Sequence, residues 1–175
     1  MKSSDKTTEF TVAKQEISLG SEKLIEIIRL VLGKNLPFRF RVKGYSMLPF
    51  IRDEDIVTVS PLTQRKVSLG WPVAFVHPEN KKLVIHRVVS CSKCGYLIKG
   101  DNVFSPDGRV VQENILGVIT QVERKKRKVL FCLGPERVLI AVVSRYLSLI
   151  PRLFFIYNRL HPAKRRFLYA RGVRL

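Results

Sequence analysis

Prolines and glycines divide residues 37–129 into short segments, and this division constrains the fold more than any other feature. Six of the segments are rich in β-branched and aromatic residues: 38–43, 55–59, 73–77, 83–90, 96–99 and 115–123. Breaks this frequent leave no room for long helices, whereas short strands joined by turns form antiparallel barrels and sandwiches. We therefore expect a mainly β domain, an antiparallel barrel or sandwich, over residues 37–129.

Helical patterns flank the β region on both sides. Before it, apolar residues recur at the spacing of one helix face, with a candidate N-cap at Ser21 and a stop at Gly33. After Pro135, residues 138–157 are strongly apolar. The sequence thus predicts three segments: an N-terminal lead and short helix over 1–36, the β domain over 37–129, and a basic, apolar helical tail over 130–175.

The positive charge is concentrated in this tail. The chain of 175 residues has a formal net charge of +18, and residues 121–175 hold fourteen of the 32 lysines and arginines against only Glu123 and Glu136. Such a tail needs a solvated surface or an anionic partner, for which lipid headgroups and nucleic acid are both candidates.

The arginines of the tail bear on how it meets a membrane. Arg137, Arg145, Arg152 and Arg159 are seven or eight residues apart, which places them near one face of a helix. Arginine in the middle of a membrane span costs about 2.5–3.5 kcal/mol. A helix lying in the interface avoids this cost. Two interpretations remain open: residues 136–175 hold the protein on a membrane surface, or they pack on the chain's own core or on a partner.

Three segments carry candidate chemistry. Ser46 lies in a turn in which a glycine two positions earlier permits a tight backbone and backbone amides can face an oxyanion; the segment reads Gly44-Tyr45-Ser46-Met47-Leu48-Pro49. His86 lies in an apolar β-branched run, and a neutral imidazole can accept a serine proton. Asp101 and Asp107 follow, and a carboxylate can orient such a histidine. Each segment taken alone is typical of an ordinary turn or a core histidine.

The order and spacing of these segments resemble the signal peptidase I family. The pattern is Gly-x-Ser-Met-x-Pro, then Asp-Ile-Val, then His-Arg-Val, then Lys-Gly-Asp-Asn with a second Asp six residues on, and it covers residues 38–120. More narrowly, it resembles the archaeal and endoplasmic-reticulum branch, where histidine replaces the lysine base. The resemblance implies a barrel or sandwich core of the signal-peptidase/LexA-like type. It also implies a serine endopeptidase that removes signal or leader peptides from precursor proteins.

Residue roles follow from the resemblance. Ser46 matches the nucleophile, His86 the general base, and Asp101 and Asp107 the two acidic positions. Asp107 is the first choice as partner of His86, with the opposite assignment left open. The implied acyl-enzyme mechanism requires no metal and no cofactor, and the substrate would be an extended peptide that adds a strand to the sheet edge.

Several positions depart from the family pattern. Gly44 stands where a serine usually assists the oxyanion hole, and the loss of such a donor costs about 2.7–4 kcal/mol in other enzymes. Glu54 stands in place of the usual glycine before Asp55, and no N-terminal transmembrane anchor is visible. These departures indicate a divergent, specialised member.

Two alternatives come from different classes. A LexA-like self-cleaving regulator would use lysine as base and cut a small-residue–Gly bond upstream of the serine, and no such Ala-Gly or Cys-Gly bond precedes Ser46. A non-catalytic basic module would bind lipid or nucleic acid. The sequence shows no nucleic-acid motif with interleaved aromatics, so we expect no specific nucleic-acid partner.

The cysteines form no disulfide framework, because there are only three. Cys91 and Cys94 have the spacing of half a zinc site, but the chain has no second Cys-x-x-Cys. Cys132, His77 and His161 are the only other thiol or imidazole candidates besides His86. The favoured interpretation is a hairpin turn that carries two thiols, with a labile disulfide or a metal left open. The sequence does not specify the oligomeric state.

Overall fold

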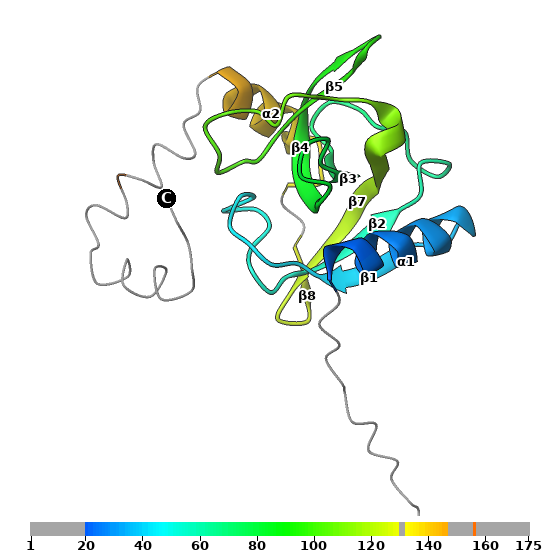
Figure 1. The fold of residues 1–175 in the computed structure, drawn as a ribbon. Coiled ribbons are helices and arrows are strands. Elements are labelled where there is room, and N and C mark those ends of the chain that lie inside the picture. The colour runs from blue at the N-terminus through cyan, green and yellow to red at the C-terminus, as the bar shows by residue number, and fades with distance from the viewer. Residues whose placement is uncertain (1–19, 130–131, 147–155, 157–175) are drawn as a thin grey trace, which may run out of the picture.

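The computed structural model describes residues 20–129, 132–146 and 156, and it is mainly antiparallel β-sheet with two helices (Figure 1). The strands follow the order β1-β2-β7-β3-β4-β5-β6, and β8 pairs with β7. Their bounds are β1 Phe38–Arg41, β2 Ile56–Ser60, β3 Pro72–Val76, β4 Leu83–Ser92, β5 Gly95–Lys99, β6 Arg109–Val110, β7 Ile115–Arg124 and β8 Arg127–Lys128. The mainly β prediction is confirmed. The sheet is open, with β1 at one end of the order and β6 at the other, rather than a closed barrel.

All six predicted strands form, and two short strands were not predicted. The basic run 124–128, which could be interpreted as a loop or a strand end, makes the β7–β8 hairpin. Its turn residues Lys125 and Lys126 have φ angles of 50° and 64°. This region of backbone space usually indicates glycine or asparagine, so the sequence carried no hairpin signal.

The central strand β3 is buried at every residue. Ala74 belongs to one core cluster, together with Ile28 and Leu32 of the N-terminal helix. Val73 and Phe75 belong to a second cluster. A strand buried on both faces reads as a continuous apolar run, and this explains why residues 72–76 lack alternation.

Helix α1, Ser21–Gly33, packs against β1, β4 and β7. The prediction of a helix here is confirmed, but the predicted cap at Ser21 is wrong. Gly20 is the N-cap, and the Ser21 hydroxyl instead accepts a hydrogen bond from the Leu83 amide at 2.9 Å. The hydroxyl therefore ties the helix to the start of β4.

Helix α2, Glu136–Tyr146, packs on β4 through Ile140, Ala141 and Ser144. Its two arginines also contact the protein. The Arg137 guanidinium lies 4.5 Å from the centre of the Trp71 ring, and Arg145 donates to the Val89 carbonyl at 3.3 Å.

The outward face of α2 is apolar, with Leu139 66% and Tyr146 71% exposed. The sequence places the arginines near one face of the helix without fixing which way that face points; Arg137 is half-buried over Trp71, whereas Arg145 is exposed beside the apolar residues. The remainder of the predicted helix, with Arg152 and Arg159, lies outside the described residues. In the part of the chain that the structure describes, no helix is long and apolar enough to cross a membrane.

Candidate active site

Ser46 lies in a turn whose following residues are buried in the hydrophobic core. Gly44 has a φ of +118°, which favours glycine, and its amide donates to Asp53 Oδ1 at 3.0 Å. Met47 and Ile51 are buried in the core cluster beneath the turn. The local pattern Gly-x-Ser-Met thus has a physical basis: glycine permits the turn, methionine fixes it, and half-buried Ser46 remains at the edge of a cleft.

His86 and Asp107 are joined by a hydrogen bond. The distance between His86 Nδ1 and Asp107 Oδ2 is 2.5 Å, and both side chains are largely buried. Asp107 is itself positioned by its amide, which donates to the Ile98 carbonyl at 2.9 Å. When Nδ1 donates its proton to this carboxylate, Nε2 remains free to accept one.

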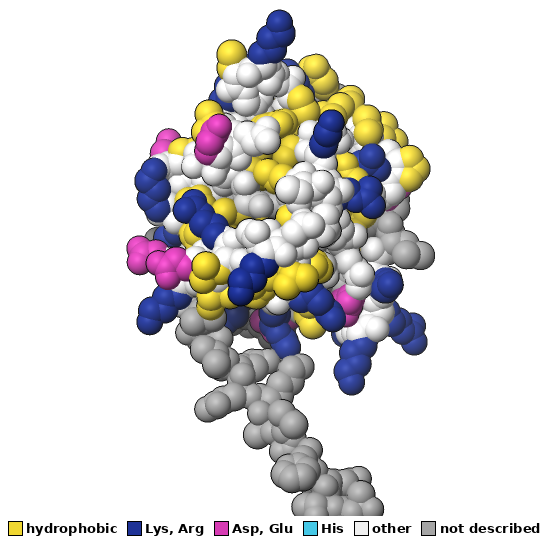
Figure 2. Space-filling model, turned by 90° about the vertical axis from the view of Figure 1, so that its right-hand side faces the viewer, with side chains coloured by type: hydrophobic (Ala, Val, Ile, Leu, Met, Phe, Trp, Pro, Cys, Tyr) yellow, Lys and Arg dark blue, Asp and Glu magenta, His cyan; other side chains and the backbone are white. Residues whose placement is uncertain are grey.

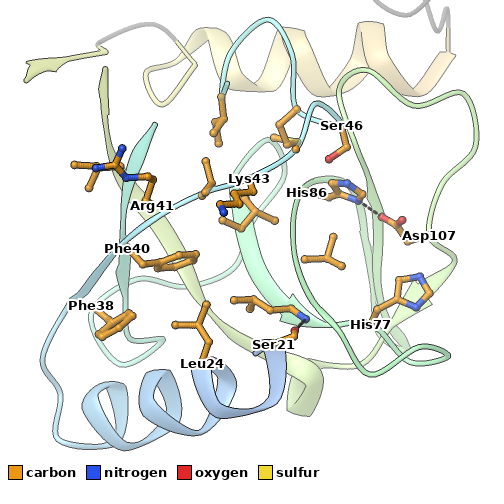
Figure 3. Close-up of a pocket in the computed structure, with 18 of the residues that line it drawn as sticks. Ser21, Leu24, Phe38, Phe40, Arg41, Lys43, Ser46, His77, His86 and Asp107 are labelled. Atoms are coloured by element: carbon orange, nitrogen blue, oxygen red, sulfur yellow. Dashed lines mark hydrogen bonds and ion pairs between the residues drawn. The ribbon is translucent and has the colours of Figure 1, made fainter. Parts of the chain in front are cut away.

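Ser46 lies on the other side of the imidazole from Asp107 (Figure 3). A Cβ atom placed on Gly100 would lie 3.0 Å from His86 Nε2 and 2.8 Å from the Ser46 carbonyl oxygen. Both atoms therefore flank one point, and Nε2 faces the serine turn. Among the described residues the Ser46 hydroxyl makes no hydrogen bond.

Asn102 connects the serine turn to the loop that carries Asp107. Its amide donates to the Ser46 carbonyl at 2.7 Å, and its side-chain nitrogen donates to the Tyr45 carbonyl at 3.3 Å. Sequence reasoning gave roles to neither Gly100 nor Asn102. The signal was the Lys-Gly-Asp-Asn motif itself, of which only the aspartate was singled out.

Asp101 forms a buried ion pair with Arg87, and the hydrogen bond to His86 comes from Asp107 instead. Both side chains are fully buried, and the two Arg87–Asp101 hydrogen bonds measure 2.8 and 2.7 Å. Burial raises the pKa of Asp101, and the charge of Arg87 opposes that rise. Of the two acids that the sequence left open, Asp107 is the hydrogen-bonding partner of His86.

Arg87 also supports the surrounding structure. It donates to the Gly70 carbonyl at 2.7 Å and to the Cys132 carbonyl at 3.2 Å, just before α2. The neighbouring Lys99 is buried and donates to the Ser144 carbonyl at 2.5 Å within α2. Burial lowers the pKa of this lysine. Both basic residues therefore fix the loop and α2 on the sheet.

Ser46, His86 and Asp107 lie at one end of a cleft with a volume of about 1100 Å³. The cleft runs beside edge strand β1 and the start of β4 as far as α1 (Figure 3). Its lining near α1 is mostly apolar and includes Leu24, Phe38, Phe40 and Leu83. An unpaired strand edge along such a cleft can accept an extended peptide.

Comparison with known proteins adds nothing to this geometry. No family model matches the chain, and no curated protein matches it. Function is therefore inferred from the residues of the site.

Proposed function

We propose that this protein is a serine endopeptidase of the signal-peptidase type, with Ser46, His86 and Asp107 as its catalytic triad. The observation that carries the proposal is the 2.5 Å hydrogen bond between His86 and Asp107, with Ser46 across the imidazole ring in the same cleft. A buried histidine oriented by a carboxylate and facing a serine is the arrangement that activates a hydroxyl for acyl transfer.

The reaction uses groups of this chain only. His86 Nε2 takes the Ser46 proton as Oγ attacks the peptide carbonyl, and Asp107 stabilises the imidazolium that forms. His86 then protonates the leaving amine, and water hydrolyses the acyl-enzyme. The Ser46 amide donates to no acceptor among the described residues, so it is a candidate oxyanion donor in the absence of a serine at position 44.

The proposed substrate is the signal or leader peptide of a precursor protein. Its extended backbone would pair with the free edge of β1, and its reactive carbonyl would reach Ser46. The apolar lining near α1 suits the apolar residues of such a peptide. As part of this proposal, we assign the open antiparallel sheet to the signal-peptidase/LexA-like type of core.

We further propose that the tail, residues 136–175, associates with an anionic membrane surface. The outward apolar face of α2 and the basic composition of the tail support this placement. The protein would then encounter precursors with apolar leaders at the same membrane surface.

The test is a cleavage assay on co-expressed candidate precursors. We expect Ser46→Ala and His86→Ala to abolish processing while the circular dichroism spectrum and melting temperature stay close to those of the wild type. Ser68→Ala removes an exposed hydroxyl outside the cleft and serves as the matched control. Full processing by Ser46→Ala would contradict the mechanism and favour a non-catalytic module.

A further inference from the structure

The β4–β5 hairpin carries two thiols that the proposed chemistry does not use. Cys91 and Cys94 are free, and both are exposed together with the intervening Ser92 and Lys93. The hairpin projects from the body of the protein at the top of Figures 1 and 2. Its tip is therefore accessible to another macromolecule.

The conformation of this tip is fixed at the residue that follows the second cysteine. Gly95 has a φ of +125°, and a Cβ atom there would lie 2.6 Å from the Val110 carbonyl oxygen. The Ser92 hydroxyl also donates to the Gly95 carbonyl at 2.8 Å. Ser92 pairs with Gly95 in the ladder, which leaves a two-residue loop. Cys91 therefore lies at the end of β4, and Cys94 lies in the two-residue loop.

Two exposed thiols at Cys-x-x-Cys spacing on a tight hairpin can provide two of the four ligands that a structural zinc ion requires. The described residues contain no group of three or more His, Cys, Asp or Glu side chains that could hold a metal. The third cysteine, Cys132, is buried beside Arg87, away from the hairpin tip. The described residues therefore provide no further ligands for this pair. A second copy of the chain offers an identical pair of cysteines.

We propose that two copies of the chain are bridged at the hairpin tips by one zinc ion bound to Cys91 and Cys94 of each. Four thiols lose four protons as Zn²⁺ binds, so the site carries a net charge of −2. Thiolates are soft ligands that select zinc over harder cations.

The charges around the tip favour this site. Lys93 lies between the cysteines, and Arg109 of the neighbouring strand β6 has its Cγ atom 3.5 Å from the Cβ position of Gly95. These cations, present in both copies, offset the negative charge of the tetrathiolate. Without the metal, the net charge of +18 on each chain opposes association.

Zinc titration of the full-length protein tests the inference. The measurement is the molar mass in solution by analytical ultracentrifugation, in a non-thiol reductant, with metal content determined in parallel. We expect conversion of monomer to dimer with one zinc per two chains, reversed by a chelator. Substituting Co²⁺ should give the charge-transfer and d–d bands of a tetrahedral thiolate site.

Variants locate the ligands. Cys91→Ser and Cys94→Ser should each abolish the zinc-dependent dimer, whereas His77→Gln, which removes a histidine outside the hairpin, should retain it. One zinc per chain in a monomer would overturn the proposal. So would a dimer that persists in the cysteine variants, or reduced protein that binds no zinc. Because none of these readouts depends on cleavage, the result is independent of the proposed peptidase activity.

Discussion

Two aspartates of one loop differ in role because their surroundings differ. Asp101 is fully buried and neutralises Arg87, whereas Asp107 is partly accessible and hydrogen-bonds His86. A buried ion pair supports the structure around it, and removing one partner leaves an uncompensated charge. In the proposed mechanism the Asp107 carboxylate orients the imidazole of His86 and stabilises the imidazolium that forms.

Asparagine at position 107 and alanine at position 101 should therefore separate activity from stability. Asp107→Asn keeps the shape of the side chain but favours the wrong histidine tautomer. We expect a fall in kcat of about 10⁴-fold with an unchanged urea midpoint. Asp101→Ala should lower the free energy of unfolding by about 3–5 kcal/mol. If Asp101→Ala proved as stable as the wild type, the buried pair would not have the supporting role described above.

The absence of a side chain at Gly100 leaves space between the serine turn and His86, and the proposed activity should depend on that space. A Cβ atom there would crowd Val103 Cγ2 at 2.7 Å, the Ser46 carbonyl oxygen at 2.8 Å and His86 Nε2 at 3.0 Å. Gly100→Ala should therefore lower kcat at least tenfold, equivalent to about 1.4 kcal/mol, by pushing the serine turn and the histidine apart. Gly33→Ala, where a Cβ would meet nothing within 4 Å, is the control. Equal rates in the two variants would show that this spacing is not critical.

At the scale of elements, the sequence predicted the helices and strands that depend on the local spacing of apolar residues. The six long strands and α1 follow from apolar runs and their breaks, and the positions of Ser46, His86 and Asp107 follow from motif order. The β7–β8 hairpin was not predicted because its turn uses lysines. Neither the role of Ser21 nor the Arg87–Asp101 pair could be predicted, because each depends on a contact between distant segments.

Helix α2 shows the limit of periodicity most clearly. The spacing of the arginines groups them near one face but does not say where that face points: Arg137 is half-buried over Trp71, whereas Arg145 is exposed although it reaches a carbonyl of β4. Arginine can pack along apolar surface while its head group finds a ring or a backbone oxygen. Val138, Leu139 and Val142 are left exposed on the same helix as Arg145.

The outward face of α2 predicts a specific defect in membrane binding. Leu139→Glu should reduce binding to vesicles with anionic lipid at least tenfold, because it places a negative charge in the apolar face. Leu36→Glu is the matched control, since Leu36 is 55% exposed and follows α1, and Figure 1 shows α1 and α2 on opposite sides of the sheet. Vesicle co-sedimentation measures both. Equal binding by the two variants would reject α2 as the contact.

At the scale of the whole molecule, charge is spread well beyond the tail. Lys and Arg side chains are scattered over the face in Figure 2, with fewer acidic ones between them. A net charge of +18 attracts anionic surfaces over a distance that salt limits to about 8 Å at physiological ionic strength. The basic surface would thus bring the protein to a membrane, and the apolar face of α2 would retain it there.

The open edge of β1 carries a risk of self-association. A strand edge that accepts a peptide can equally pair with the same edge of another copy and begin aggregation. Here the strand and the residues after it read Phe38-Arg39-Phe40-Arg41-Val42-Lys43, so every second side chain is cationic. Arg39 and Arg41 are ion-paired with Glu123 and Glu54. Charged side chains along a strand edge disfavour its pairing with another strand edge, because they must be desolvated first. The same alternation that defines the strand therefore also disfavours pairing between two copies of this edge.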